Sequence, residues 1–359
     1  MRARLSLGLL AAALCAGCGD FQDVSTVVDL RVLDVSADPP EILVDPTKLA
    51  AFIADPEGAP LPTSGPAQSR LTALIGDPAG GERTITVDAV ACPRSIDAVT
   101  AATGRNGIVC APVDPASTDP NASVAVTQPP PAPPTTAART TFGDAELTLP
   151  FSFPADLLVR AYQNDPYARL GFQLPVAFQF TVSAGAASEV AIKRVIFTVP
   201  PDGHSDQKPN ANPRIPSVIT YNMRDANADP VDPQPVALDQ PLPVPLGTSL
   251  WLEPQGADGE AERYFTRELT HDATPQVVTS LETETLRYAF YATAGTFSPP
   301  STNTVIPIIR SKPDRAHLES KYQAPRIMPA DPNVTFWIVV RDERGGSSWI
   351  KGHFVLAAP

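Results

Sequence analysis

Hydrophobic and polar residues alternate with a period of two along several stretches of the chain, which is typical of β-strands that bury one face. The clearest stretch is 172–182, FQLPVAFQFTV, where every second residue is a large apolar one. The same alternation marks 145–153 and 83–92. In 188–199 the phase slips near Lys193, as a β-bulge would cause. These patterns predict an all-β chain.

Further strands are predicted on both sides of residue 200. Those of the first half are 29–36, 47–53 and 70–75, and those of the second half are 215–222, 248–254, 286–297, 304–310, 334–342 and 348–357. The last two are joined by DERGGS, where Gly345 and Gly346 can supply the positive φ angles of a tight hairpin. Short helical turns are expected at 95–102, 154–162 and 314–322. The 42 prolines support this assignment, because proline breaks helix interiors but is tolerated in turns and at strand edges.

The strands group into two domains. Residues 112–139 are rich in proline and poor in bulky apolar side chains, so we expect a disordered loop there. We place this loop inside the first domain, because the strands before it need those after it to complete a sandwich; an interdomain linker is the alternative. The polar run 201–213 is the predicted linker between a β-sandwich at 29–200 and a second one at 214–359.

The N-terminus carries a targeting pattern. Two arginines precede an apolar stretch of ten residues, too short to span a bilayer, and small residues then lead to Cys18. This pattern resembles a bacterial lipoprotein signal with its lipobox, although Cys15 stands where leucine is usual. The resemblance implies a signal peptide at 1–17, a lipidated Cys18 as the first mature residue, and a tether at 18–28.

Two other interpretations of the N-terminal cysteines are an ordinary cleaved signal and a functional Cys-x-x-Cys pair. A redox pair would need a βαβ context and a helix start that stabilises the thiolate, and the sequence offers neither. In the lipoprotein family an Asp after the lipidated cysteine favours retention in the inner membrane of some bacteria. Gly19 stands there instead, so we expect an outer-membrane, lipid-anchored protein that faces the periplasm or the cell surface.

Charge and cysteine content narrow the picture further. The formal net charge is −12, and loss of the two signal arginines makes the mature chain more negative. An acidic chain is repelled by nucleic acid, so no nucleic-acid partner is expected. Cys92 and Cys110 would lie in an oxidising compartment, where we expect them to form a disulfide worth roughly 3 kcal/mol.

Two segments of the second half carry a family resemblance. LRYAFYATAGTFSPPSTNT (286–304) and DPNVTFWIVVRDERGGSSW (331–349) look like the Ig-like and PKD-like modules of bacterial surface proteins. Those modules have an aromatic-alternating strand and a penultimate strand ending in Val-x-Asp-x-x-Gly-Gly. The resemblance implies two tandem Ig-like β-sandwiches that act as spacers or binding units, usually without catalytic residues. It does not specify a ligand.

One acidic loop is a weak candidate for calcium. Asp225, Asn227, Asp229 and Asp232 present several oxygen ligands within eight residues, as in the first half of an EF-hand loop. Pro230 occupies the position of the EF-hand glycine, so that motif fails. A turn-rich loop, in which Asp, Asn and Pro are favoured for backbone reasons, is the stronger interpretation.

The tryptophans suggest another kind of site. Trp251, Trp337 and Trp349 could form an aromatic platform for a sugar. Trp337 is out of phase with Phe336 and Ile338, so we expect one of the two strand faces to be core and the other not. If Trp337 is exposed, it is a candidate ligand contact.

These observations favour a non-enzymatic envelope lipoprotein that serves adhesion, scaffolding or assembly. The alternative is a surface-held carbohydrate-binding protein. An enzyme is not expected, because no nucleophile, base and oxyanion donor converge in the sequence. No cofactor is expected beyond the lipid on Cys18, and the expected partners are the membrane and envelope proteins or glycans.

Overall fold

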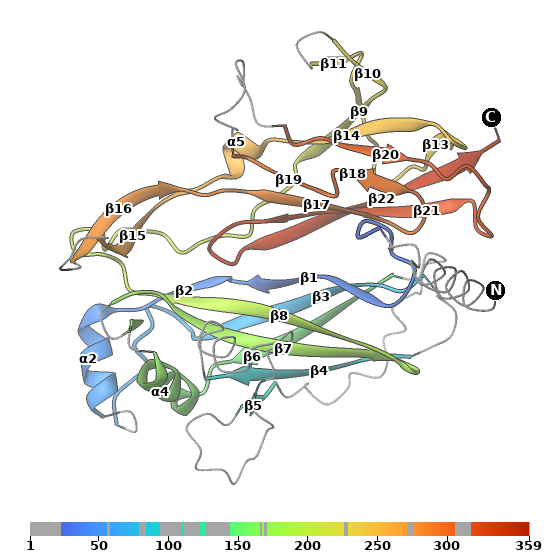
Figure 1. Ribbon diagram of the computed structural model, residues 1–359. Helices are drawn as coiled ribbons and strands as arrows, with labels where there is room; N and C mark the ends of the chain where they lie inside the picture. The colour runs from blue at the N-terminus through green and yellow to red at the C-terminus, as the bar shows by residue number, and fades with distance from the viewer. Residues whose placement is uncertain are drawn as a thin grey trace, which may run out of the picture.

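The computed structural model shows a mainly β protein with two stacked bodies (Figure 1). It describes residues 23–55, 58–78, 84–93, 110, 123–126, 144–165, 167–168, 171–225, 229–270, 274, 276–305 and 317–358. Each body encloses its own hydrophobic core. The core of the first body draws on residues from Leu30 to Val199, and that of the second on residues from Ile215 to Leu356.

The first body pairs a five-stranded sheet, order β2-β8-β7-β4-β5, with a three-stranded sheet, order β1-β3-β6. The strands are β1 (Arg31–Asp38), β2 (Glu41–Leu43), β3 (Gln68–Gly76), β4 (Ile85–Cys92), β5 (Val124–Ala125), β6 (Asp144–Ser152), β7 (Leu174–Ala184) and β8 (Ala187–Thr198). All neighbours are antiparallel except β2 and β8. Phe151, Phe153, Phe178 and Phe197 fill the core with edge-to-face ring contacts 4.9–5.7 Å apart.

Two helices lie at one end of the first body, α2 (Pro46–Ala54) and α4 (Ala155–Asn164). The helical turn expected at 154–162 is confirmed as α4, whereas the strand expected at 47–53 is wrong. Asp45 caps α2 by accepting a hydrogen bond from the Thr47 backbone N–H at 2.9 Å, and Pro46 stands in the first turn, where proline is favoured. The buried Phe52 anchors the helix to the core.

The second body packs two five-stranded sheets, with orders β12-β9-β14-β20-β18 and β13-β22-β21-β17-β19. The strands are β9 (Ser217–Tyr221), β12 (Gln234–Pro235), β13 (Leu242–Pro245), β14 (Ser249–Gln255), β17 (Arg287–Ala292), β18 (Thr296–Ser298), β19 (Ser301–Asn303), β20 (Ser320–Gln323), β21 (Asn333–Arg341) and β22 (Ser347–Ala357). Two ribbons extend from it, β10 (Met223–Arg224) with β11 (Pro230–Val231), and β15 (Arg263–Leu269) with β16 (Val277–Thr283). A single-turn helix, α5 (Ala257–Glu260), precedes β15.

Two further sequence predictions need correction, and two others fall largely or wholly on residues that the structure does not describe. Within the loop predicted to be disordered at 112–139, residues 123–126 are ordered, because β5 pairs with β4. The helical turn expected at 314–322 is wrong over its last residues, which begin β20. The turn expected at 95–102 and most of the strand expected at 304–310 lie outside the described residues.

The phase slip near Lys193 is not a bulge. β7 and β8 pair without interruption from Leu174 to Ala184. Instead, residues on both faces of β8 are buried from Val195 to Thr198, and Lys193 is buried as well, whereas Arg194 is exposed. The alternation disappears because the second body covers the face that would otherwise be solvated.

Candidate functional site: the interface between the two bodies

An apolar cluster joins the two bodies. It contains Val27, Leu33 and Leu74 from the first part of the chain, and Trp337 and Val339 from β21. All five are at most 2% exposed. Strand β21 is therefore buried on both faces, and the expectation that only one face would be core is wrong. Trp337 is 0% exposed and is not accessible to a ligand.

The three tryptophans do not form one platform. Trp349 also lies at the interface, where its Nε1 donates to Glu146 Oε1 at 2.8 Å. Trp251 lies on β14, in the other sheet of the second body, and the Arg224 guanidinium covers its ring at 3.7 Å from the centroid. The indole faces are thus dispersed over two regions and occupied by protein groups.

A tight hairpin presents Arg344 to the first body. Asp342 Oδ1 accepts from the Arg344 backbone N–H at 2.9 Å and from the Gly346 N–H at 2.7 Å, which closes the turn between β21 and β22. Gly345 takes the expected positive φ of 88°, but Gly346 does not. Glycine is still required at 346, because a Cβ there would overlap the Asp342 carboxylate. The Val-x-Asp-x-x-Gly-Gly pattern therefore encodes this turn.

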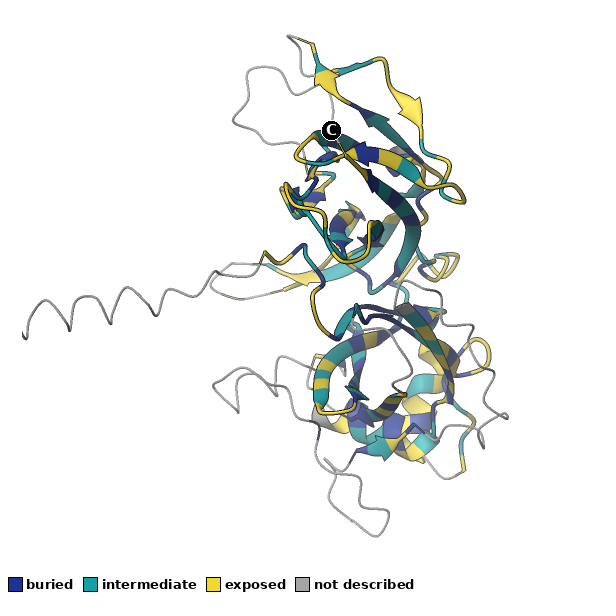
Figure 2. Cartoon of the chain, turned by 90° about the vertical axis from the view of Figure 1, so that its right-hand side faces the viewer, coloured by how far each residue is buried: buried dark blue, intermediate teal, exposed yellow. Residues whose placement is uncertain are grey.

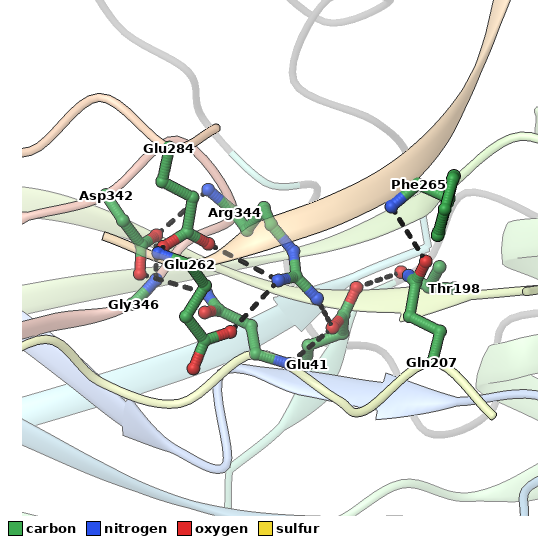
Figure 3. A network of polar contacts seen from close by, with 10 residues as sticks. Glu41, Thr198, Gln207, Glu262, Phe265, Glu284, Asp342, Arg344 and Gly346 are labelled. Atoms are coloured by element: carbon green, nitrogen blue, oxygen red, sulfur yellow. Dashed lines mark hydrogen bonds and ion pairs between the residues drawn. The ribbon is translucent and has the colours of Figure 1, made fainter. Parts of the chain in front are cut away.

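The Arg344 side chain lies among three carboxylates (Figure 3). It pairs with Glu41 of β2, and at 3.3 Å each with Glu284 Oε1 and Glu262 Oε2. The side chains of Arg344, Glu41 and Glu284 are at most 2% exposed, whereas that of Glu262 is 38% exposed. The guanidinium also lies over the Tyr264 ring, 4.6 Å from its centroid. Because Glu41 belongs to the first body, this network crosses the interface.

Burial governs the protonation of the network. It raises the pKa of Glu284 to about 7, an effect that nearby Asp342 reinforces and Arg344 opposes. Burial also raises the pKa of Glu262, which Arg344 again opposes. The pKa of Asp342 is raised for the same reason, against a hydrogen bond from Asn210. One guanidinium thus faces carboxyls that are easier to protonate than usual, which lessens their mutual repulsion.

The polar run predicted as a linker is bonded to both bodies. Asn210 is 2% exposed; its backbone N–H donates to Glu41, and its Nδ2 donates to Asp342 Oδ2 at 3.0 Å. Asn212 Nδ2 donates to the Ala37 carbonyl at 2.7 Å, while its Oδ1 accepts from the Ser347 N–H at 2.9 Å. These residues are therefore part of the interface and not a free spacer.

Two further cations cross the same boundary. Arg341 Nε lies 2.8 Å from Asp34 Oδ1, and its Nη2 donates to the Leu33 carbonyl at 2.7 Å. Lys193 Nζ donates to Ser347 Oγ at 2.9 Å. Burial lowers the pKa of Lys193 to about 8, although Asp34 and other carboxylates oppose the shift.

The β15–β16 ribbon reaches from the second body to the first (Figure 1). Arg267 Nη1 donates to the carbonyls of Gly171 at 2.6 Å and Val199 at 3.0 Å. The Phe265 N–H donates to Gln207 Oε1 at 2.9 Å, and its ring stacks on His204 at a centroid distance of 3.5 Å. The ribbon thus adds a second zone of contact.

The predicted tether is docked over its described part. The Val27 N–H donates to the Ala292 carbonyl at 2.8 Å, and the Ala292 N–H donates to the Ser25 carbonyl at 2.8 Å. Thr26 Oγ1 donates to the Gly295 carbonyl at 2.7 Å. Ser25 and Val27 are 0% exposed. Residues 23–28 are therefore held on the second body, while residues 1–22, including Cys15 and Cys18, lie outside the described part of the chain.

The remaining predicted sites have mixed outcomes. Cys92 and Cys110 form a disulfide with a Cα–Cα distance of 5.7 Å, which confirms the pairing. In the acidic loop, Asp225 Oδ1 accepts from the Asp229 N–H at 2.9 Å, Asp232 takes a φ of 51°, and Asn227 is outside the described residues. Over the described ranges, no group of three or more His, Cys, Asp or Glu side chains is placed to hold a metal ion.

Sequence reasoning missed Arg344, Glu41 and Glu284 as partners. Two local signals existed: Glu41 directly precedes the apolar residues 42–44, and Arg344 lies inside the Val-x-Asp-x-x-Gly-Gly pattern. Neither signal identifies the partner. Where the chain is described, no helix is both long and apolar enough to cross a membrane.

Comparisons with known proteins give little beyond this architecture. No protein-family model matches the sequence, and no curated protein matches it. A weak structural match is the adhesin InvE of Yersinia pseudotuberculosis, at 9% sequence identity and a TM-score of 0.17. The alignment covers 91% of this chain, and the chain spans 60% of that adhesin chain. At this score the match carries no argument about function.

Proposed function

We propose that this protein is a non-enzymatic envelope lipoprotein, anchored in the outer membrane through a lipid on Cys18, whose two Ig-like β-sandwiches act together in adhesion, scaffolding or assembly. The observation that carries the proposal is the interface. Buried apolar and ionic contacts, the 201–213 segment and the β15–β16 ribbon all join the two bodies. Such a unit holds surfaces on both bodies at fixed positions, as a spacer or scaffold requires.

The alternative of a carbohydrate-binding protein receives less support. An aromatic platform needs exposed ring faces, whereas Trp337 is buried and the Trp251 ring is covered by Arg224. The Ig-like and outer-membrane assignments rest on the sequence resemblances. The lipid anchor rests on the lipobox pattern that ends at Cys18.

Fractionation tests the anchor. We expect Cys18→Ala to release the protein from the membrane fraction, whereas the matched Cys15→Ala variant stays attached. Equal release of both variants, or of neither, contradicts a lipid on Cys18.

Crosslinking in intact envelopes tests the scaffold role. We expect the wild-type protein to be crosslinked to an envelope protein. In a separate binding measurement, that envelope protein should bind the purified, signal-free chain directly. Binding of the purified chain to isolated envelope glycans, with no protein partner, would instead favour the alternative function.

A further inference from the structure

The start of the described chain determines where a lipid anchor would attach. Ser25 and Val27 are buried on the second body, so the chain leaves from a fixed point there. Cys18 is five residues before Asp23. A fully extended chain of that length spans at most about 18 Å. A bilayer that holds a lipid on Cys18 therefore lies within roughly this distance of this end of the molecule.

The loop between β20 and β21, residues 324–332, lies at the same end. Thr26 donates to the Gly295 carbonyl, and a Cβ on Gly295 would lie only 2.6 Å from the Gln323 carbonyl oxygen. Gly295 therefore contacts both Thr26 of the docked segment and Gln323 at the end of β20. The 324–332 loop begins directly after Gln323. Figure 1 shows this loop and the C-terminal end of β22 on the right, and Figure 2 looks onto that side of the molecule.

This loop exposes large apolar side chains. Ile327 is 84% exposed and Met328 is 41% exposed, and Arg326 precedes them. On the docked segment 23–28, which bonds to Ala292 and Gly295, Val24 and Val28 are 58% and 54% exposed. Exposed apolar groups next to an anchoring point are costly in water. In the boundary between lipid head groups and acyl chains they are favourable, and a neighbouring arginine can reach the phosphates.

We propose that the 324–332 loop inserts Ile327 and Met328 into the head-group region of the bilayer that holds the lipid on Cys18. The inference rests on the proposed lipid anchor. The bilayer is the chosen occupant because the short chain between Cys18 and Asp23 holds this end beside it. The loop then supplies a second membrane contact, which sets the orientation of both bodies.

A fluorescent label that senses lipid tests the insertion. Met328→Cys and Val278→Cys introduce one free thiol each at side chains that are both 41% exposed. Residue 328 belongs to the 324–332 loop and residue 278 to β16, and Figure 1 shows these two segments at opposite ends of the molecule. The full, lipidated chain is labelled and reconstituted in phosphatidylcholine vesicles that contain bromine-substituted lipid. We expect the label at 328 to shift its emission to shorter wavelength and lose most of its intensity, while the label at 278 is unchanged.

The mass of the N-terminal peptide shows whether Cys18 carries lipid, and so distinguishes failure of the insertion from failure of the anchor. If Cys18 carries lipid but the label at 328 is not quenched, or both labels are quenched equally, the insertion is refuted and the anchor stands. If Cys18 carries no lipid, both proposals are overturned. If the emission shift of the label at 328 grows with protein density and does not depend on the brominated lipid, the label contacts another copy of the chain, and insertion is refuted.

Discussion

Replacement of Arg344 by alanine is expected to uncouple the two bodies. The change leaves Glu41 and Glu284 buried without their cation, whereas the half-exposed Glu262 gains water. Glu284 can take up a proton, because its pKa is already raised to about 7. The remaining cost is mainly that of the Glu41 carboxylate. Loss of one partner of a buried ion pair costs about 3–5 kcal/mol.

Urea unfolding of the signal-free chain at pH 7 measures this cost. Trp337 and Trp349 lie at the interface, so their fluorescence reports its opening, and far-UV circular dichroism reports the sheets. We expect the wild type to unfold with coincident transitions in both signals. In Arg344→Ala the fluorescence transition should occur at lower urea and separate from the circular dichroism transition.

The matched control is Arg214→Ala, which removes the same charge from an exposed pair. Arg214 is 79% exposed and lies 3.2 Å from Glu260, so its loss should cost roughly 0–1 kcal/mol. The reasoning is refuted if the two variants lose equal stability. It is also refuted if Glu41→Gln and Arg344→Ala have strictly additive effects, since paired residues must show coupling.

Three other changes test the protonation of the Arg344 network, the apolar cluster and the disulfide. Burial raises the pKa of Glu284 in the folded protein from 4.5 to about 7, so between these pH values the folded chain holds a proton that the unfolded chain has released. The free energy of unfolding should therefore fall as pH rises from about 4.5 to 7. Glu284→Gln should flatten this fall, as measured by urea unfolding at several pH values. Trp337→Ala should cost about 3–5 kcal/mol in urea unfolding, and Trp337→Phe clearly less, because the ring fills the apolar part of the interface. Joint replacement of Cys92 and Cys110 by serine should cost roughly 3 kcal/mol, and thermal unfolding of the reduced wild type should match that variant.

Local patterns predict the strands that bury one face against their own body. The alternation at 172–182 locates β7 to within two residues, because every second residue from Leu174 to Ala184 belongs to the core of the first body. The error at 47–53 has a local cause as well. Asp45 and Pro46 form a helix start signal that outweighs the β-branched residues of the segment, and apolar residues three apart then place Leu49 and Phe52 on one side.

Local patterns do not predict the interface between the two bodies, because it depends on residues far apart in sequence. Polar residues of 201–213 look like a solvated linker, yet Asn210 is buried because Glu41 and Asp342 satisfy its hydrogen bonds. The unbroken apolar run of β21 is a partial signal, since strands covered on both faces lose their alternation. It shows that something covers Trp337 but not what.

The N-terminal segment 23–28 contacts the interface itself. Val27 belongs to the apolar cluster that contains Leu33 of the first body and Trp337 of the second. Its backbone bonds to Ala292, so the segment is held on the second body before the chain enters the first. The first body is then held through the interface as well as through β1. A buried ion network suits this place, because its directional hydrogen bonds fix one register where an apolar cluster alone would allow sliding. The position of the first body relative to residues 23–28 therefore depends on the Arg344–Glu41 contact as well as on the direct chain connection through β1.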